Sequence, residues 1–244
     1  MKLKDIFKME MYKNRNDVPY LVVIAILTGM AAVASILGVF MIENSINQST
    51  LLVLEVILIV FTIIGLSVFF LLYPFHLLNV DYKNRVMSLI FASGVSRGKY
   101  YFVKISATIL SSLIAILVIL LIPIVTFLIV YPDTFVEFVQ NVVTSFKSSD
   151  IISFVLSAIV GLVASIVTLT TAVIITKGKV SGIFLYFGFS WIVSMLQSFS
   201  LIGRIADIGA TAVSNYLYTS LILSVIQIVA FVLIGLYVLR KQDL

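Results

Sequence analysis

Positive charge is concentrated in four short segments of this 244-residue chain. Of its 16 lysines and arginines, 14 fall within residues 1–17, 76–104, 177–179 and 240–244. The sequence between them is almost wholly apolar and divides into six runs, each long enough to cross a bilayer as a helix of about 20 residues. Because basic segments stay on the cytoplasmic side, the pattern predicts an all-α integral membrane protein with six transmembrane helices and both termini in the cytoplasm.

Composition supports this class and narrows the chemistry. Hydrophobic residues make up 61% of the chain and charged residues only 11%, whereas about a quarter of a soluble domain is charged. The longest stretch outside the spans, 76–104, is shorter than the roughly 40 residues that a core of its own needs. We therefore expect residues 1–244 to form one transmembrane domain, without a separate soluble unit.

Few residues are suited to catalysis or metal binding. The chain has no cysteine and one histidine, His76, and only Glu55 among the carboxylates lies well within a span. The residues needed for thiol catalysis, for a multi-histidine metal site and for a pair of facing carboxylates are therefore missing. We expect no enzyme activity, metal or cofactor on this chain. The net charge of +5 lies beside the spans, which favours anionic membrane lipids rather than nucleic acid as a partner.

The expected spans cover about 18–42, 51–75, 105–131, 150–176, 180–203 and 217–239. Residues 1–17 predict an interfacial helix with Leu3, Ile6, Phe7 and Met11 on its apolar face, although Glu10 intrudes on that face. Helical spacing in 132–149 predicts a second interfacial helix. Span two is expected to end at Tyr73-Pro74, and Pro123 to kink span three. The turn Lys177-Gly178-Lys179 makes spans four and five an antiparallel pair.

The segment 81–104, DYKNRVMSLIFASGVSRGKYYFVK, is the most specific stretch. Asp81 is suited to cap a helix that runs to about Ser93, Gly94 to end it in the left-handed conformation, and Ser96 to cap the helix that enters span three. These signals predict a rigid helical elbow on the cytoplasmic side. The alternative is an interfacial loop whose charges only set the topology.

The order of residues in this segment resembles the inner coupling segment of type-2 ABC exporter permeases. It has an acidic residue, an apolar helix, a small-Gly turn, Ser96-Arg97 and then Lys104 entering span three. The basic N-terminal helix, the six spans and the ending 239–244, LRKQDL, are similar to that family too. The short outer connection 204–216 departs from the longer helical pair of many members.

The resemblance implies a permease subunit that pairs with a second permease copy, as a homodimer or heterodimer, and binds two ATPase subunits. It implies that residues 81–93 form the coupling helix in the ATPase cleft. The coupling residues are then Asp81, Lys83, Arg85, Met87, Ile90, Gly94, Ser96 and Arg97. The chain has no G-x-x-x-x-G-K-[ST] phosphate-binding loop, so ATP and Mg are expected on the partner ATPase.

Polar residues within the spans suggest where a substrate passes. Ser190, Ser194 and Gln197 lie among aromatic residues of span five, which fits either a path for an amphipathic substrate or hydrogen bonds between helices. Glu55 is either an interfacial carboxylate or part of the outer mouth. The small residues Ser157, Gly161 and Ser165 of span four predict close packing of helices.

Two functions follow as hypotheses. The first is an ABC exporter permease of a bacterial plasma membrane that moves hydrophobic or amphipathic substrates outward, namely peptides, antibiotics or lipids. Within the family, the likeness extends to permeases of amphipathic-peptide export, such as phenol-soluble-modulin exporters, and of antibiotic immunity. The second is an ATP-independent membrane protein, either a secondary transporter or an assembly partner. Ionisable groups near mid-bilayer, which a proton- or sodium-driven transporter needs, are scarce.

Overall fold

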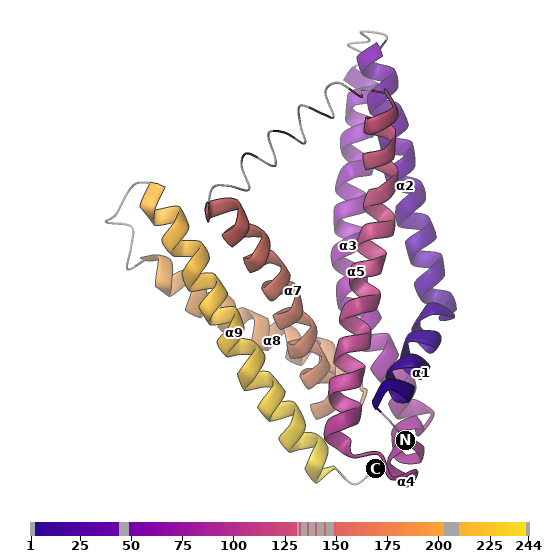
Figure 1. Cartoon of the computed structure of the whole chain (residues 1–244), viewed down its shortest axis with the longest axis vertical. Coiled ribbons are helices and arrows are strands. Elements are labelled where there is room, and N and C mark those ends of the chain that lie inside the picture. Colours follow the sequence, from indigo (N-terminus) through magenta and orange to yellow (C-terminus); the bar gives the residue numbers. More distant parts are fainter. Residues whose placement is uncertain are drawn as a thin grey trace.

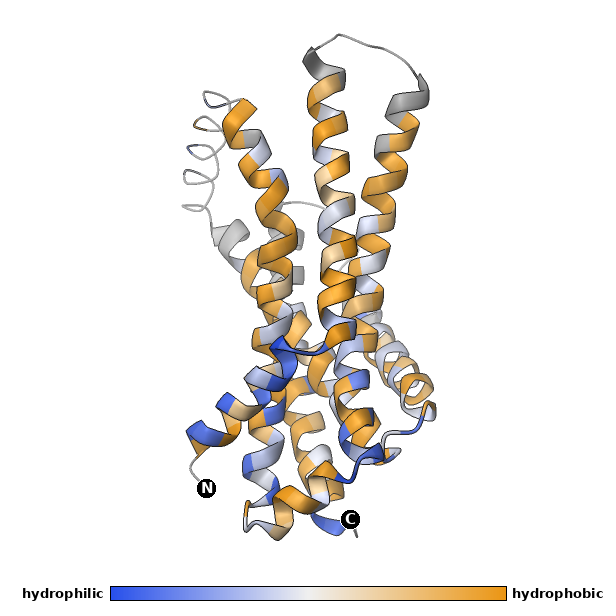
Figure 2. Ribbon diagram, turned by 90° about the vertical axis from the view of Figure 1, so that its right-hand side faces the viewer, coloured by the Kyte–Doolittle hydropathy of each residue, from blue (hydrophilic) through white to orange (hydrophobic). Residues whose placement is uncertain are grey.

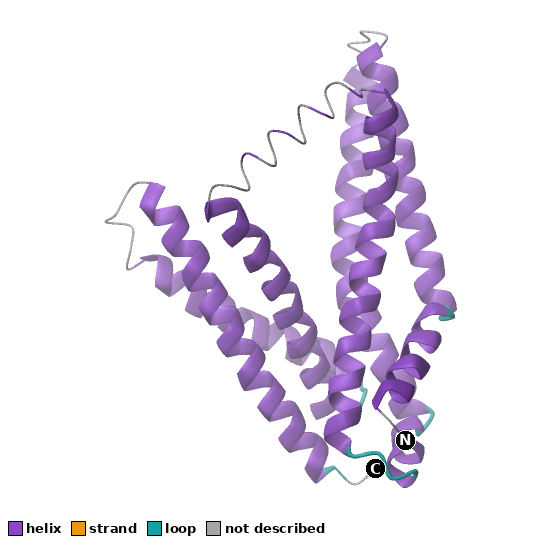
Figure 3. Ribbon diagram, in the orientation of Figure 1, coloured by secondary structure: helices purple, strands orange, loops and turns teal. Residues whose placement is uncertain are grey.

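The chain is almost entirely helical. The structure, a computed structural model, describes residues 3–43, 49–130, 149–202 and 210–242, together with the single residues 132, 136, 140 and 144. Over these residues every regular element is a helix (Figure 3). The predicted outer interfacial helix at 132–149 lies almost wholly outside the described residues.

Long helices alternate with short connections. The elements are α1 (Leu3–Arg15), α2 (Val18–Glu43), α3 (Ser49–Lys83), α4 (Val86–Ala92), α5 (Arg97–Val130), α7 (Ser149–Ile175), α8 (Ser181–Ile202) and α9 (Ala210–Lys241).

Five of the described helices are long and apolar enough to cross a membrane. The candidate spans are Val18–Phe40, Val56–Lys83, Arg97–Val130, Val155–Ile175 and Tyr218–Lys241. They correspond to five of the six predicted spans, and the chain is a multi-pass membrane protein. The remaining predicted span, 180–203, is the shorter helix α8, which is not among the five. Six crossings therefore stay a prediction.

The helices form two groups that meet at one end (Figure 1). In one group α2 contacts α3 and α5, and in the other α7 contacts α8 and α9; α3 and α5 both touch α7. The groups diverge away from the end that holds α1, α4, the α7–α8 turn and the end of α9. We call this the basic end, because the hydrophilic residues gather there (Figure 2).

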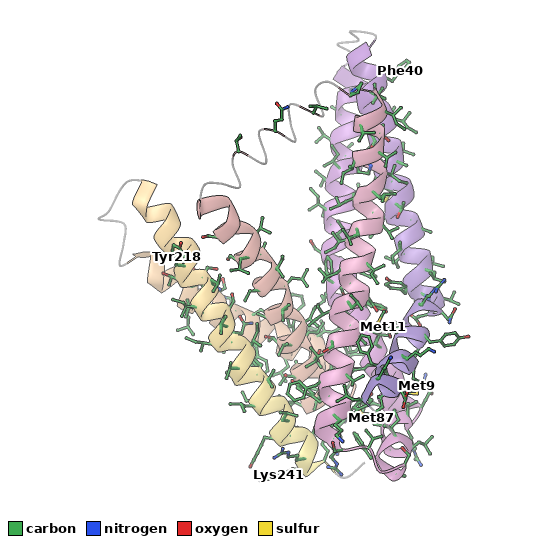
Figure 4. All side chains as sticks on the ribbon, in the orientation of Figure 1. Met9, Met11, Phe40, Met87, Tyr218 and Lys241 are labelled. Carbon is green, nitrogen blue, oxygen red and sulfur yellow. The ribbon has the colours of Figure 1, made fainter. Side chains whose placement is uncertain are left out.

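Both described termini lie at the basic end (Figure 1). The apolar core there is shared by five helices, since Ile6 of α1 packs in one cluster with Leu78 of α3, Met87 of α4, Tyr100 of α5 and Leu169 of α7. Figure 4 places Met87 and Lys241 at this end and Phe40 at the opposite one. The joint between the two helix groups is therefore a packed core.

The predicted end of span two differs from the structure. Span two was expected to end at Tyr73-Pro74, but α3 continues through Pro74 to Lys83. Burial of Tyr73, Leu77 and Leu78 against neighbouring helices compensates for the one backbone hydrogen bond that a proline removes. Pro123 lies inside α5, and a kink there stays a prediction.

Helix α1 packs on the protein through a face that sequence reasoning misjudged. Its buried residues are Ile6, Glu10 and Asn14, which recur every four residues along one side. Leu3, assigned to the apolar face, is exposed. The intruding Glu10 is instead at the centre of the contact between α1 and α5.

Candidate functional site

In the elbow between α3 and α5, the residues predicted to end α4 and to begin α5 have these roles in the structure. Gly94 has φ 84, the left-handed conformation that ends α4 and that glycine adopts without strain. The backbone N–H of Lys99 donates to Oγ of Ser96 at 3.4 Å, so Ser96 caps α5. The predictions for these two residues are confirmed.

The prediction for Asp81 as a helix cap is wrong. Asp81 lies within α3, and Arg85, with φ 54 and no side-chain cap hydrogen bond, occupies the position before α4. Helix α3 continues past Asp81 to Lys83 because the Asp81 carboxylate is buried among cations. The left-handed conformation of Arg85 then separates α3 from α4.

Asp81 belongs to a buried charge cluster that consists of Glu10, Lys13, Asp81, Tyr100 and Lys104. Nζ of Lys104 lies 2.8 Å from Oε2 of Glu10 and 2.6 Å from Oδ2 of Asp81. Lys13 pairs with Oδ1 of Asp81, and the Tyr100 hydroxyl donates to Oδ2 at 2.7 Å. Two carboxylates thus face two ammonium groups, and the cluster is neutral.

The charge cluster joins three helices. Side chains of Glu10, Asp81 and Lys104 are 1%, 0% and 2% exposed and come from α1, α3 and α5. Charges this deeply buried persist only when they are paired, so the cluster holds α1 against both spans. Sequence reasoning placed Lys104 at the start of span three but missed its partner Glu10. The available signal was that two acidic residues, Glu10 and Asp81, and one basic residue, Lys104, lie next to apolar residues just outside the predicted spans.

Arg97 ties the elbow to the other end of the chain. Its Nη1 donates to the carbonyl oxygens of Leu239 at 2.8 Å, Arg240 at 2.7 Å and Gln242 at 2.8 Å. Leu239 and Arg240 lie in the last turn of α9 and Gln242 directly follows the helix, so no helical N–H satisfies these carbonyls. The guanidinium thereby caps α9.

Gln242 extends this connection to α3 and α7. Its amide nitrogen donates to the carbonyl oxygen of Ile174 at 2.6 Å, and its Oε1 accepts from the Tyr82 hydroxyl at 2.9 Å. The ends of α3, α7 and α9 thus meet through one buried side chain. A displacement of the elbow therefore has direct contacts through which to reach both helix groups.

Helix α4 has one buried and one outward apolar face. Met87 is 1% exposed and sits in the core at the basic end, whereas Leu89 is 69% exposed. Ile90 and Phe91 pack partly against that core. The apolar residues of α4 (Met87, Leu89, Ile90 and Phe91) were all expected to be available for docking on a partner. The buried Met87 instead holds α4 in place, and Leu89 is the outward apolar residue.

The predicted path and packing residues meet in one cavity of about 300 Å³ between α7, α8 and α9, which we call the polar cavity. It is lined by Ser157, Gly161, Ser165, Tyr186, Ser190, Val193, Ser194, Gln197, Ser220, Ser224 and Gln227. Ser157 and Ser220 lie near one end of their candidate spans, and Ser165 and Gln227 near the middle. None of the described residues that line it is charged.

Hydrogen bonds organise the wall of the polar cavity. The Gln227 amide donates to Thr168 Oγ1 at 2.8 Å, and the Ser165 and Tyr186 hydroxyls lie 2.7 Å apart. Ser190, Ser194 and Gln197 therefore stand opposite polar groups of α7 and α9, which sequence reasoning did not connect with them. Glu55 lies in α3, and its side chain is outside the described residues.

Close helix packing occurs elsewhere than predicted. A Cβ built on Gly161 meets no atom within 4 Å, whereas one on Gly235 of α9 lies 2.6 Å from the Tyr101 hydroxyl and 3.1 Å from Thr171 Oγ1. Within the chain, the glycine of the predicted small-residue stripe faces a cavity. A contact of that stripe across a dimer stays a prediction.

A second cavity lies at the basic end, between the end of α3, the start of α4 and the α7–α8 turn. This basic cavity has a volume of about 570 Å³ and is lined by Asn79, Asp81, Tyr82, Lys83, Arg85, Met87, Ser88, Lys177, Gly178 and Lys179. Lys83 and Arg85, both assigned to the predicted coupling segment, are exposed. The structure brings them together with the two lysines of the turn.

Comparisons of the chain with protein-family models, with curated proteins and with solved structures found no match. Its function is therefore inferred from its own residues.

Proposed function

We propose that this chain is the permease subunit of an ABC exporter in a bacterial plasma membrane, driven by ATPase subunits on separate chains. The observation that carries the proposal is the elbow: a short helix with an exposed apolar residue, Leu89, that is joined by buried contacts to the ends of the long helices. A partner that pushes on α4 acts on α3, which contacts it directly, and on α5 through Phe91, whose ring centroid lies 5.5 Å from that of Tyr100. It acts on α9 through Arg97.

The topology that this function requires is six crossings. The turn 177–179 lies against Tyr82 at the basic end, and α9 ends at the same place through Gln242. Helix α8 leaves this end and α9 returns to it, which favours α8 as the remaining crossing. Its polar residues Ser190, Ser194 and Gln197 line the polar cavity and so need not face lipid.

The polar cavity supports the substrate class. Its described lining offers hydroxyl and amide groups and no charged residue, which suits uncharged hydrogen-bonding groups such as peptide amides, and Val193 and the ring of Tyr186 in the same wall suit apolar side chains. An amphipathic peptide combines both. The exporter would hold such a substrate between α7, α8 and α9, and a second permease copy would complete the path.

A secondary transporter is the second candidate, because Glu10, Asp81 and Lys104 are buried ionisable residues of the kind that proton-driven transport uses. They line no part of the polar cavity and lie at the basic end. This separation between the ionisable groups and the cavity favours the ATP-driven hypothesis.

The test uses a charge on the outward face of α4. Leu89→Asp should abolish co-purification of a nucleotide-binding subunit and substrate-stimulated ATP hydrolysis, because a carboxylate replaces the exposed apolar contact. The change should leave the unfolding temperature intact, since Leu89 packs on nothing buried. Tyr12→Asp, at an exposed residue of α1, is the matched control. A native extract in which no ATPase accompanies the wild-type chain would end the proposal.

A further inference from the structure

The basic cavity carries four cations that no described residue of the chain neutralises. Lys83, Arg85, Lys177 and Lys179 line it, and none of them forms an ion pair with a described residue. Like charges that converge on one space repel each other. The fold nevertheless brings the four together from two separate connections.

The one carboxylate in the cavity wall is already occupied. Oδ1 of Asp81 pairs with Lys13, and Oδ2 accepts from Lys104 and Tyr100. Asp81 therefore leaves the four cations uncompensated. The other polar residues in the described lining, Asn79, Tyr82 and Ser88, carry no charge, so this lining attracts an anion.

The backbone holds two of the four cations in a conformation that costs energy. Arg85 and Lys177 have φ 54 and 52, the left-handed region that residues with a Cβ avoid. The carbonyl of Arg85 accepts from the Ser88 hydroxyl at 2.7 Å, and Gly178 closes the end of α7 with a hydrogen bond to the carbonyl of Val173 at 2.9 Å. Such strained positions are common at binding sites.

The cavity lies where a membrane surface would reach it. The candidate spans of α3 and α7 end at Lys83 and Ile175, next to the cavity residues. From Val180, which follows Lys179, an apolar stripe of exposed residues runs along one face of α8. It comprises Val180, Phe184, Phe187 and Trp191, which are 54% to 73% exposed.

We propose that the basic cavity is a binding site for the phosphate headgroup of an anionic phospholipid, whose acyl chains lie along the exposed stripe of α8. The phosphate is held by the four cations, and the stripe supplies the apolar contact that a soluble phosphate cannot use. The site requires only that the chain is a membrane protein, and it is independent of exporter activity.

The test measures lipid binding to the detergent-solubilised full-length chain. Dioctanoyl phosphatidylglycerol, dioctanoyl phosphatidylcholine and inorganic phosphate are titrated separately, and the bound species are counted by native mass spectrometry. The wild type should bind phosphatidylglycerol in preference to the other two. The double variant K177Q/K179Q should weaken that binding at least about tenfold, since each basic residue near an anionic lipid surface contributes appreciably.

The control is K4Q/K8Q, which removes the same charge from exposed positions of α1. Equal weakening in this control would mean that net charge alone attracts the lipid, and would overturn the proposal. Equally tight binding of inorganic phosphate would assign the cavity to a soluble phosphate compound instead. If the double variant keeps its lipid but loses a co-purifying protein, the cavity belongs to an acidic protein surface. An unchanged unfolding temperature in phosphatidylcholine shows that each variant is folded.

Discussion

Two charged regions lie side by side at the basic end, and they differ in how their charges are balanced. In the charge cluster of Glu10, Lys13, Asp81, Tyr100 and Lys104, every carboxylate has an ammonium partner within the chain. In the basic cavity, four cations have none among the described residues. Asp81 lines both regions but contributes its charge to the cluster alone. The comparison indicates that the cluster holds helices together, whereas the cavity is built for a partner.

The largest expected effect is on the charge cluster. Lys104→Met would leave Glu10 and Asp81 buried with one cation fewer, which costs about 3–5 kcal/mol of stability. We expect a large fall in the unfolding temperature in detergent. Lys99→Met, at an exposed lysine of the same helix, should change it little. Similar unfolding temperatures for the two variants would remove the distinction between the regions.

Arg97→Ala should have the next largest effect. It removes three hydrogen bonds from a charged donor to carbonyls at the end of α9 and of Gln242 just after it, each of which can contribute about 1.5–3 kcal/mol before compensation by water. Hydrogen exchange at 238–242 should accelerate strongly. Lys83→Ala, a cation of the basic cavity, should leave exchange there unchanged. Equal exchange in both variants would refute the role of Arg97 as a cap.

A pair of glycine substitutions extends the comparison from charge to packing. Gly235→Ala forces a Cβ against Tyr101 and Thr171, and overpacking of this kind costs about 1–3 kcal/mol. Gly161→Ala enters the polar cavity and should cost less than about 1 kcal/mol. Thermal unfolding of the two variants measures the difference. A larger loss in Gly161→Ala would indicate a close contact there, such as one across a dimer.

The smallest effect is expected in the basic cavity itself. K177Q/K179Q should leave the unfolding temperature of the lipid-free protein unchanged or slightly higher, because it relieves repulsion between like charges. A fall in the unfolding temperature as large as that of Lys104→Met would show that these lysines have partners within the fold. The two charged regions would then not differ in how their charges are balanced.

Much of the secondary structure was predictable from local pattern. Apolar runs of the right length predict the long helices, and Gly94 and Ser96 predict the end of α4 and the start of α5, because these effects depend on neighbouring residues only. The end of α3 was misplaced because Pro74 was judged by its own backbone, without the burial of Tyr73, Leu77 and Leu78.

The candidate sites were predictable only in part. Ser190, Ser194 and Gln197 stood out as polar residues within an apolar run, but their partners Ser220, Ser224 and Gln227 come from another helix. Glu10 looked like a fault in an amphipathic face, since its partner Lys104 lies 94 residues away. The polar cavity and the charge cluster both depend on which helices become neighbours in space. The spacing of residues along the chain does not determine which helices are neighbours.

The sequence by itself determined that this chain is an α-helical membrane protein with its positive charge gathered at one side, because hydrophobicity and charge act on each segment separately. Only the tertiary structure decided which charges are paired. It buried Glu10, Asp81 and Lys104 together and left Lys83, Arg85, Lys177 and Lys179 around a cavity. The physical reason is that Coulomb interactions depend on distance in space, which helix packing sets.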